Sequence, residues 1–186
     1  MADQVDEAPS TTTQRPDETA EAPQQRPPDH FSKLGNSKPA TMWANALDKA
    51  VAPPYRAARK AHLTDLLHGT AILRHPLHPA LSDLPIGLYL AAVIAYAGGM
   101  PRAGILLTLA GVAGALGAAI TGLADWSVSD GTDKRLGAIH GLVNVLATLG
   151  AGASIATFYA VSHQLALGFV AAALGITLVA AYLGGH

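Results

Sequence analysis

Polar and apolar positions separate along this chain into a polar beginning and a long apolar remainder. Up to about residue 40 the sequence is rich in Pro, Thr, Gln, Asp and Glu and has almost no large apolar residues. Such a segment cannot bury enough apolar surface to offset the entropy lost on ordering. We therefore expect residues 1–40 to form a disordered tail.

The next segment, residues 41–74, mixes apolar and charged positions at roughly helical spacing, with Pro53 and Pro54 dividing it into two short helices. Two interpretations are open. The helices could lie on the membrane surface, where the basic residues around Arg56 would face anionic headgroups. They could instead form a soluble helical hairpin that packs on the rest of the protein.

Four apolar stretches follow, each close to the ~20 residues that cross a bilayer. They cover about residues 84–100, 103–124, 136–161 and 165–183. Short connections force consecutive helices to be antiparallel. The predicted fold class is all-α: an integral membrane four-helix bundle of up-down-up-down topology, formed by residues 75–186 behind the disordered tail.

Composition agrees with a membrane protein. Half of the 186 residues are hydrophobic and only 13% are charged, whereas soluble domains carry about 25% charged residues. The net charge of −1 gives no reason to expect nucleic acid as a partner. The chain has no cysteine, which excludes disulfides and Cys-held iron–sulfur clusters within it.

Lysine and arginine predict the orientation. Most of them near the apolar stretches lie on the side of the tail or in the 125–135 connection, and Arg102 is alone on the other side. The positive-inside rule then places both termini in the cytoplasm of a bacterial inner membrane. The expected partners are the lipid bilayer, a second copy of the chain as a homo-oligomer, and a redox protein.

Small residues recur every four positions in the second apolar stretch, which predicts close helix packing in lipid. One row consists of Ala110, Gly114, Ala118 and Gly122, and the neighbouring row consists of Gly111, Ala115 and Ala119.

The unusual polar residues gather at one end of the predicted bundle. They are His75 and His78 before the first span, Asp125 and Trp126 at the end of the second, His140 and Asn144 early in the third, and His186 after the fourth. His140 and Asn144 share a helix face because residues i and i+4 stack. Ionisable groups inside spans usually face the bundle interior.

The motif HPLHP sets the expected geometry of the first two histidines. A residue before proline avoids the α region, so His75 and His78 are expected to be extended. Their side chains would then stand about 9 Å apart, too far to share an ion. A ligand or metal ion held by His140 together with His78, His75 or His186 is favoured instead.

Three interpretations of this histidine cluster remain open. The histidines could hold haem b or a metal, with Asn144 or Asp125 bonded to a ligand's second nitrogen and Trp126 nearby. They could instead hydrogen-bond to Asp83, Asp125 and backbone groups and so close the bundle, with His78 as a helix N-cap before Pro79. A quinone or proton-handling site is the third. The remaining histidines, His62, His68 and His163, are expected to be interfacial.

Several of these segments together resemble a bacterial membrane family, domain of unknown function 2231. They are LLHGTAILRHPLHPALSDLPIGL, GLADW, RLGAIHGLVNVLA and AYLGGH, within about residues 66–186. The resemblance implies four transmembrane helices and no established activity. It also implies a partner, because some members are joined to a Rieske-type iron–sulfur domain.

The sequence has no nucleophile motif, phosphate loop or paired-carboxylate site, so no self-sufficient catalytic centre is predicted. Two functions are expected from different classes. One is a redox-linked membrane module that binds haem b or a metal through histidines. The other is a non-catalytic anchor or scaffold that recruits a partner, such as a Rieske-type protein.

Overall fold

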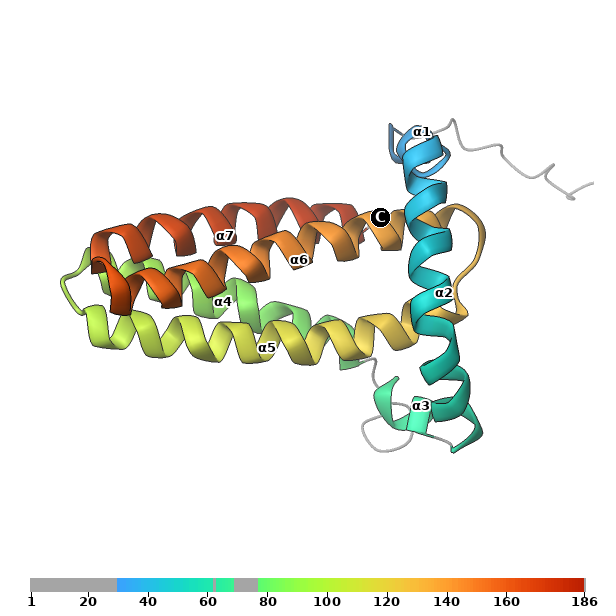
Figure 1. The fold of residues 1–186 in the computed structure, drawn as a ribbon, viewed down its shortest axis with the longest axis horizontal. Coiled ribbons are helices and arrows are strands. Elements are labelled where there is room, and N and C mark those ends of the chain that lie inside the picture. Colours follow the sequence, from blue (N-terminus) through green and yellow to red (C-terminus); the bar gives the residue numbers. More distant parts are fainter. Residues whose placement is uncertain (1–29, 62, 69–76, 186) are drawn as a thin grey trace, which may run out of the picture.

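The structure, a computed structural model, describes residues 30–61, 63–68 and 77–185, and these residues form helices joined by short turns (Figure 1). The helices are α1 (His30–Gly35), α2 (Lys38–Lys60), α3 (Leu63–Leu67), α4 (Leu77–Ala97), α5 (Pro101–Val128), α6 (Gly131–Ala160) and α7 (His163–Gly184). The predicted all-α class is confirmed.

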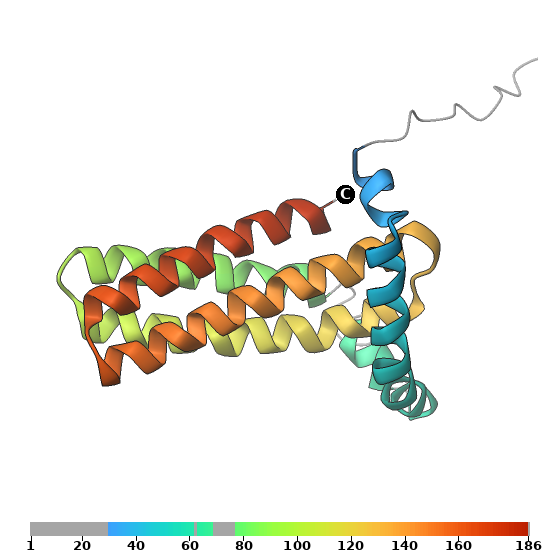
Figure 2. The same ribbon diagram turned by 45° about the horizontal axis from the view of Figure 1, so that its top comes forward.

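Helices α4 to α7 form an antiparallel four-helix bundle made of two hairpins (Figures 1 and 2). In the first hairpin α4 packs mainly on α5, and in the second α6 packs mainly on α7, with looser packing between the hairpins. Each of the four is long and apolar enough to cross a bilayer. The predicted multi-pass membrane bundle is confirmed.

The helices extend beyond the predicted spans at one end of the bundle. Helix α4 begins at Leu77 instead of residue 84, α5 continues to Val128, and α6 begins at Gly131 instead of residue 136. The predicted connection of residues 125–135 is therefore reduced to Ser129 and Asp130. An apolar stretch shows only which residues cross the hydrocarbon core of the bilayer. The helix itself can continue beyond the core, where its polar side chains have partners.

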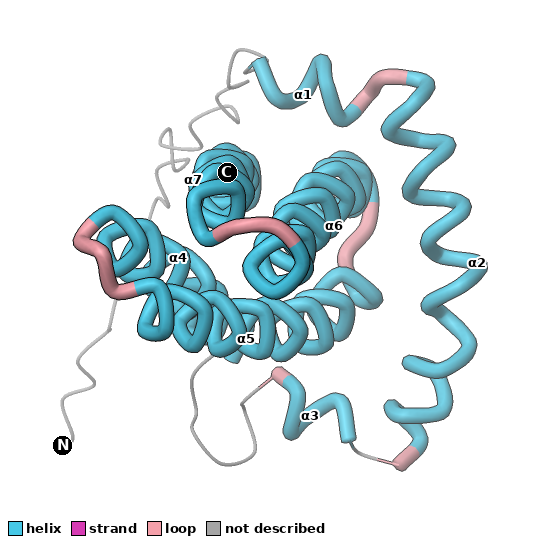
Figure 3. The backbone as a smooth tube through the Cα atoms, turned by 60° about the vertical axis from the view of Figure 1, so that its left-hand side comes forward, coloured by secondary structure: helices cyan, strands magenta, loops and turns pink. Residues whose placement is uncertain are grey.

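Helix α2 runs across this end of the bundle, and α1 to α3 together wrap one side of it (Figures 1 and 3). Ala44 packs with Trp126 of α5 and Ala138 of α6, and Leu47 and Val51 pack against the same cluster.

Two predictions for this region are wrong. Residues 30–40, predicted as part of the tail, are helical, because Ser37 caps α2 by accepting from the Ala40 backbone N–H and Ala40 is buried. Residues 1–29 lie outside the described part of the chain. Pro53 and Pro54 do not divide the segment: α2 runs through them.

Tertiary contacts on both sides explain why the helix survives the two prolines, which remove backbone donors. Val51 packs on the bundle before them. After them, the Tyr55 hydroxyl donates to the Ile120 carbonyl at 2.6 Å. Burial also raises the pKa of Tyr55 above its usual value.

The exposed apolar side chains of α2 test the two interpretations of this segment. Met42 is 70% exposed and Trp43 48% exposed, although the helix also packs on the bundle. If α2 lies at the membrane interface, Trp43 in the Trp126→Phe variant, which then has a single tryptophan, should be quenched by lipids brominated near the headgroup. Trp43 fluorescence equal in brominated and unbrominated vesicles would place α2 in water, as a soluble helical hairpin requires.

Candidate functional site

His78 lies in the first turn of α4 and points at α5. Its Nδ1 lies 2.9 Å from the Ala118 carbonyl oxygen. The imidazole rests against Gly122, where an added Cβ would come within 2.6 Å of the ring. Glycine at residue 122 therefore allows the ring to lie against the α5 backbone.

His140 repeats this arrangement in the second hairpin. Its Nδ1 lies 2.7 Å from the Ala180 carbonyl oxygen of α7. Its ring rests against Gly184, where an added Cβ would come within 2.7 Å. Asn144, one turn further along α6, has its amide nitrogen 3.0 Å from His140 Nε2.

The two arrangements are related by a constant offset in sequence. His140, Ala180 and Gly184 each come 62 residues after His78, Ala118 and Gly122, and the first residues of α7 and α5 are separated by the same interval. The two hairpins therefore repeat one arrangement at these positions, and we infer that they are related by a pseudo-two-fold axis. This repeat was not predicted from the sequence, although the shared histidine, alanine and glycine positions could have revealed it.

The two histidines meet across the interface between the hairpins. Their ring centres are 6.2 Å apart and their planes are perpendicular. At the other end of the bundle Tyr96 and Phe158, which are again separated by 62 residues, face each other with ring centres 6.2 Å apart. Equivalent side chains therefore pair along the pseudo-two-fold axis.

The hydrogen bonds determine the tautomer of both rings. A carbonyl oxygen only accepts, so Nδ1 of His78 and of His140 must donate. In a neutral imidazole the other nitrogen, Nε2, then carries a lone pair. The Asn144 amide donates to that lone pair on His140, whereas His78 Nε2 has no hydrogen-bond partner among the described residues. Both rings therefore have the tautomer of a histidine that binds a metal through Nε2, and on His140 the Asn144 amide occupies that nitrogen.

The local prediction for His78 is wrong. The residue is helical and neither extended nor an N-cap, because α4 begins at Leu77. Pro79 fits in this first turn, where the backbone N–H that proline lacks would have no helical acceptor. His75, His186 and His62 lie outside the described residues.

The residues predicted to surround the histidines lie elsewhere. Asp83 is exposed on α4, five residues from His78 and so on a different face. Asp125 lies 2.5 Å from His68 Nδ1. Trp126 is buried and donates from Nε1 to the Lys134 carbonyl at 2.7 Å, with the Lys134 ammonium 4.8 Å from its ring centre.

These contacts fasten the turn between α5 and α6 to the helices that cross it. Lys134 pairs with Asp48 of α2 at 2.6 Å, and Arg135 donates to the Gly35 carbonyl of α1 at 2.6 Å. His68, predicted only as interfacial, is therefore the partner of Asp125, and Trp126 belongs to the packing of α2. His163 is exposed at the opposite end of the bundle.

A metal ion held by protein groups alone usually needs three or four of them. The described residues contain no group of three or more His, Cys, Asp or Glu side chains arranged to hold one. The structure brings together two predicted ligands, His78 and His140, with Asn144 beside them.

No protein-family model, curated protein or solved structure matches this chain. The conclusions about function therefore depend on the geometry of the histidine pair.

Proposed function

We propose that this protein is a redox-linked membrane module that binds haem b between His78 and His140. The observation that supports it is the pairing of the two imidazoles across the hairpin interface, each held through Nδ1 by a carbonyl of its own hairpin. This holds each Nε2 lone pair as a potential iron ligand before any cofactor binds.

The number of the ligands fits haem better than a bare metal ion. A porphyrin would supply four nitrogens of its own, so two protein ligands, His78 and His140, would be enough to hold its iron, whereas a bare metal ion usually needs three or four protein groups.

Binding requires two local changes. Asn144 must release His140 Nε2, which it now occupies as a donor. The two hairpins must also part at this end so that a porphyrin can enter between the imidazoles. Two hollows on the described surface do not serve this purpose, because one is lined mainly by α2 and the start of α6, and the other by Arg56, Arg59 and Lys60. The looser packing between the hairpins favours such parting.

A purely structural network would be expected to join the hairpins. Instead, the bonds of His78 and His140 to backbone carbonyls stay within one hairpin each, and the rings meet without a hydrogen bond between them. Between the hairpins the pair makes a perpendicular ring contact only. Its arrangement is better explained by a group that binds between them.

Titration of the detergent-purified, cofactor-free protein with haemin tests this function. We expect a sharp Soret band that saturates at one haem per chain, with the low-spin spectrum of two axial histidines. The His163→Ala variant, altered at the far end of the bundle, should give the same curve. A broad band that grows without saturation would indicate haem dissolved in detergent and would contradict the proposal.

An anchor or scaffold is the second candidate, and the position of α2 favours it. The helix crosses the end of the bundle with Met42 and Trp43 exposed, so it could present a surface to a partner. A Rieske-type protein is the partner that the family resemblance implies. In this function the histidines need no cofactor.

The orientation in a bacterial inner membrane is also proposed from charge. The end with the histidine pair has Arg56, Arg59, Lys60, Lys134 and Arg135, whereas the other end has Arg102. A cytoplasmic reporter fused after His186 should be active, and one inserted at Gly99 should report the periplasm. The reverse pattern would place the histidine pair on the periplasmic side.

A further inference from the structure

Three basic residues near the C-terminal end of α2 form a basic cluster on one face of the helix. Arg56, Arg59 and Lys60 are three and four positions apart, a spacing that brings side chains together on a helix surface. All three are exposed, and together they line an open hollow. None of them forms an ion pair with another residue in the described part of the chain. Like charges at this spacing repel each other, so an anion in the hollow would relieve the repulsion.

The basic cluster lies beside the four-helix bundle, where lipid surrounds the spans. Figures 1 and 3 show α2 crossing α5 and continuing, together with α3, beyond the outline of the bundle. This part of α2 therefore overhangs the lipid next to α5.

Tyr55 fixes the depth of this part of α2. Its hydroxyl donates to the Ile120 carbonyl at 2.6 Å. Ile120 is eight residues before the end of α5 at Val128, about 12 Å along the helix. Tyrosine is enriched at such depths, at the boundary of membrane and water. The Tyr55 ring reaches from there up to the α2 backbone, so the basic cluster lies nearer the water, at the level of the lipid phosphates.

An exposed apolar stripe on α5 leads from this point into the hydrocarbon core. Its residues Ile120, Leu116 and Leu109 are four and seven positions apart and so share one helix face. They are 53%, 55% and 40% exposed. From Ile120 to Leu109 the stripe covers about 16 Å along the helix, which is about half of the ~30 Å hydrocarbon core. Its length therefore matches one acyl chain of a single leaflet.

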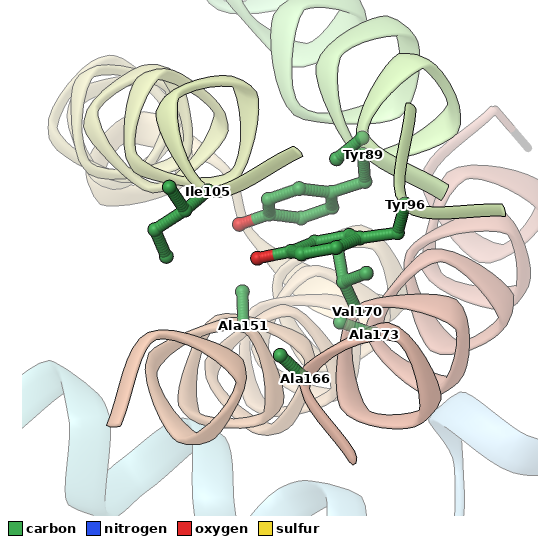
Figure 4. Close-up of a cluster of buried hydrophobic side chains, with 8 residues drawn as sticks. Tyr89, Tyr96, Ile105, Ala151, Ala166, Val170 and Ala173 are labelled. Atoms are coloured by element: carbon green, nitrogen blue, oxygen red, sulfur yellow. The ribbon is translucent and has the colours of Figure 1, made fainter. Parts of the chain in front are cut away.

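Side chains fill the interior of the bundle at this depth. Tyr89 and Tyr96 of α4 pack there with Ala151, Ala166 and Val170 of the second hairpin (Figure 4). Each of these five residues is at most 4% exposed. A close-packed interior has no room for an acyl chain, so the chain of a bound lipid belongs on the outer face of α5.

We propose that the hollow at Arg56, Arg59 and Lys60 binds the phosphate of one anionic phospholipid, whose acyl chain lies along the apolar stripe of α5. The two guanidinium groups and the ammonium donate charge-assisted hydrogen bonds to the phosphate oxygens. A zwitterionic headgroup brings a cation of its own, which the basic cluster repels. Binding needs no cofactor, so it does not depend on haem.

Native mass spectrometry of the cofactor-free protein, with lipid added in detergent, tests the headgroup site. We expect one phosphatidylglycerol per chain, bound more tightly than phosphatidylcholine with the same acyl chains. Arg56→Gln, Arg59→Gln and Lys60→Gln should each weaken phosphatidylglycerol binding about fivefold, and the triple variant about a hundredfold. An excess of inorganic phosphate should not displace the lipid, because it has no chain for the stripe on α5.

The matched control removes three other cations at the same end of the molecule. Lys33→Gln, Lys38→Gln and Lys49→Gln together change the net charge equally, and these lysines are exposed away from the hollow. This variant should keep the affinity of the unaltered protein. Equal binding of both lipids, or equal weakening by the two triple variants, would overturn the proposal, as would displacement of the lipid by inorganic phosphate. Circular dichroism verifies that each variant is folded.

A tryptophan at Leu116 tests the acyl-chain part. The chain has two tryptophans, so Leu116→Trp is made together with Trp43→Phe and Trp126→Phe, in vesicles of phosphatidylcholine. A small fraction of phosphatidylglycerol with brominated chains should quench this tryptophan more than the same fraction of brominated phosphatidylcholine. Leu146→Trp, at a 52% exposed position of α6, should be quenched equally by both. Equal quenching at Leu116 as well would mean that no anionic lipid is held beside α5 and would contradict the site.

Discussion

His78→Ala and His140→Ala should each abolish haem retention while the protein stays folded and inserted. Each residue would supply one of the two protein ligands in the proposed site, so the loss of either leaves the iron with a single histidine. His163→Ala, at the exposed far end of the bundle, should retain haem fully. Haem content per chain after size-exclusion chromatography measures all three. Retention of haem by either alanine variant would show that the iron is held elsewhere.

Asn144 distinguishes this account from a structural network. If haem binds, His140 Nε2 coordinates iron and Asn144 is displaced, so Asn144→Ala should keep haem affinity or increase it. If the histidines only close the bundle, His140→Ala leaves the Ala180 carbonyl and the Asn144 amide unpaired, which lowers the free energy of unfolding by roughly 1–3 kcal/mol. In that case Asn144→Ala should also destabilise the protein, and there would be no haem to lose.

The second large effect is expected from the contact between α4 and α5. A Cβ added at Gly114 would lie 2.9 Å from Leu84 Cβ, an atom close to the backbone that cannot rotate away. Gly114→Leu or Ala118→Leu should therefore separate the two helices and destabilise the bundle by about 3 kcal/mol or more, at the upper end of overpacking. Leu107→Ala removes a half-buried side chain and should cost no more than about 2 kcal/mol, the low end for core leucines.

Ala119→Leu is the matched control for Ala118→Leu. Ala118 is 7% exposed, whereas its neighbour Ala119 is exposed on the outer surface of α5, so the same substitution there should be nearly neutral in lipid. Unfolding in mixed detergent micelles measures the series. Similar losses for Ala118→Leu and Ala119→Leu would mean that the small-residue row does not pack against α4.

The four spans could be predicted from sequence because long apolar runs have few alternatives to crossing a bilayer. The path of α2 through Pro53 and Pro54 could not, since it depends on contacts on either side, such as the bond from Tyr55 to Ile120. Local propensity alone favours a break there. Tertiary packing decided the outcome.

The sequence predicted at which end of the bundle the candidate site residues lie, but not which way their side chains point. Topology places His78, His140, Asp125 and Trp126 at the same end of the bundle, but it does not say which way each side chain points. Asp125 and Trp126 turn toward His68 and Lys134, on the outer side where α2 and α3 lie. The pairing of His78 with His140 depends on the 62-residue repeat, which is carried by few identical residues and is weak in the sequence.

The central claim is that His78 and His140 bind haem, and a reduced-minus-oxidised absorption spectrum of the unaltered protein, purified from haem-replete cells, tests it most directly. The account predicts a Soret band and the sharp α and β bands of a b-type haem with two axial histidines. Metal analysis of the same sample should give about one iron per chain. A flat difference spectrum with no bound metal would contradict the redox function and leave the scaffold as the better explanation.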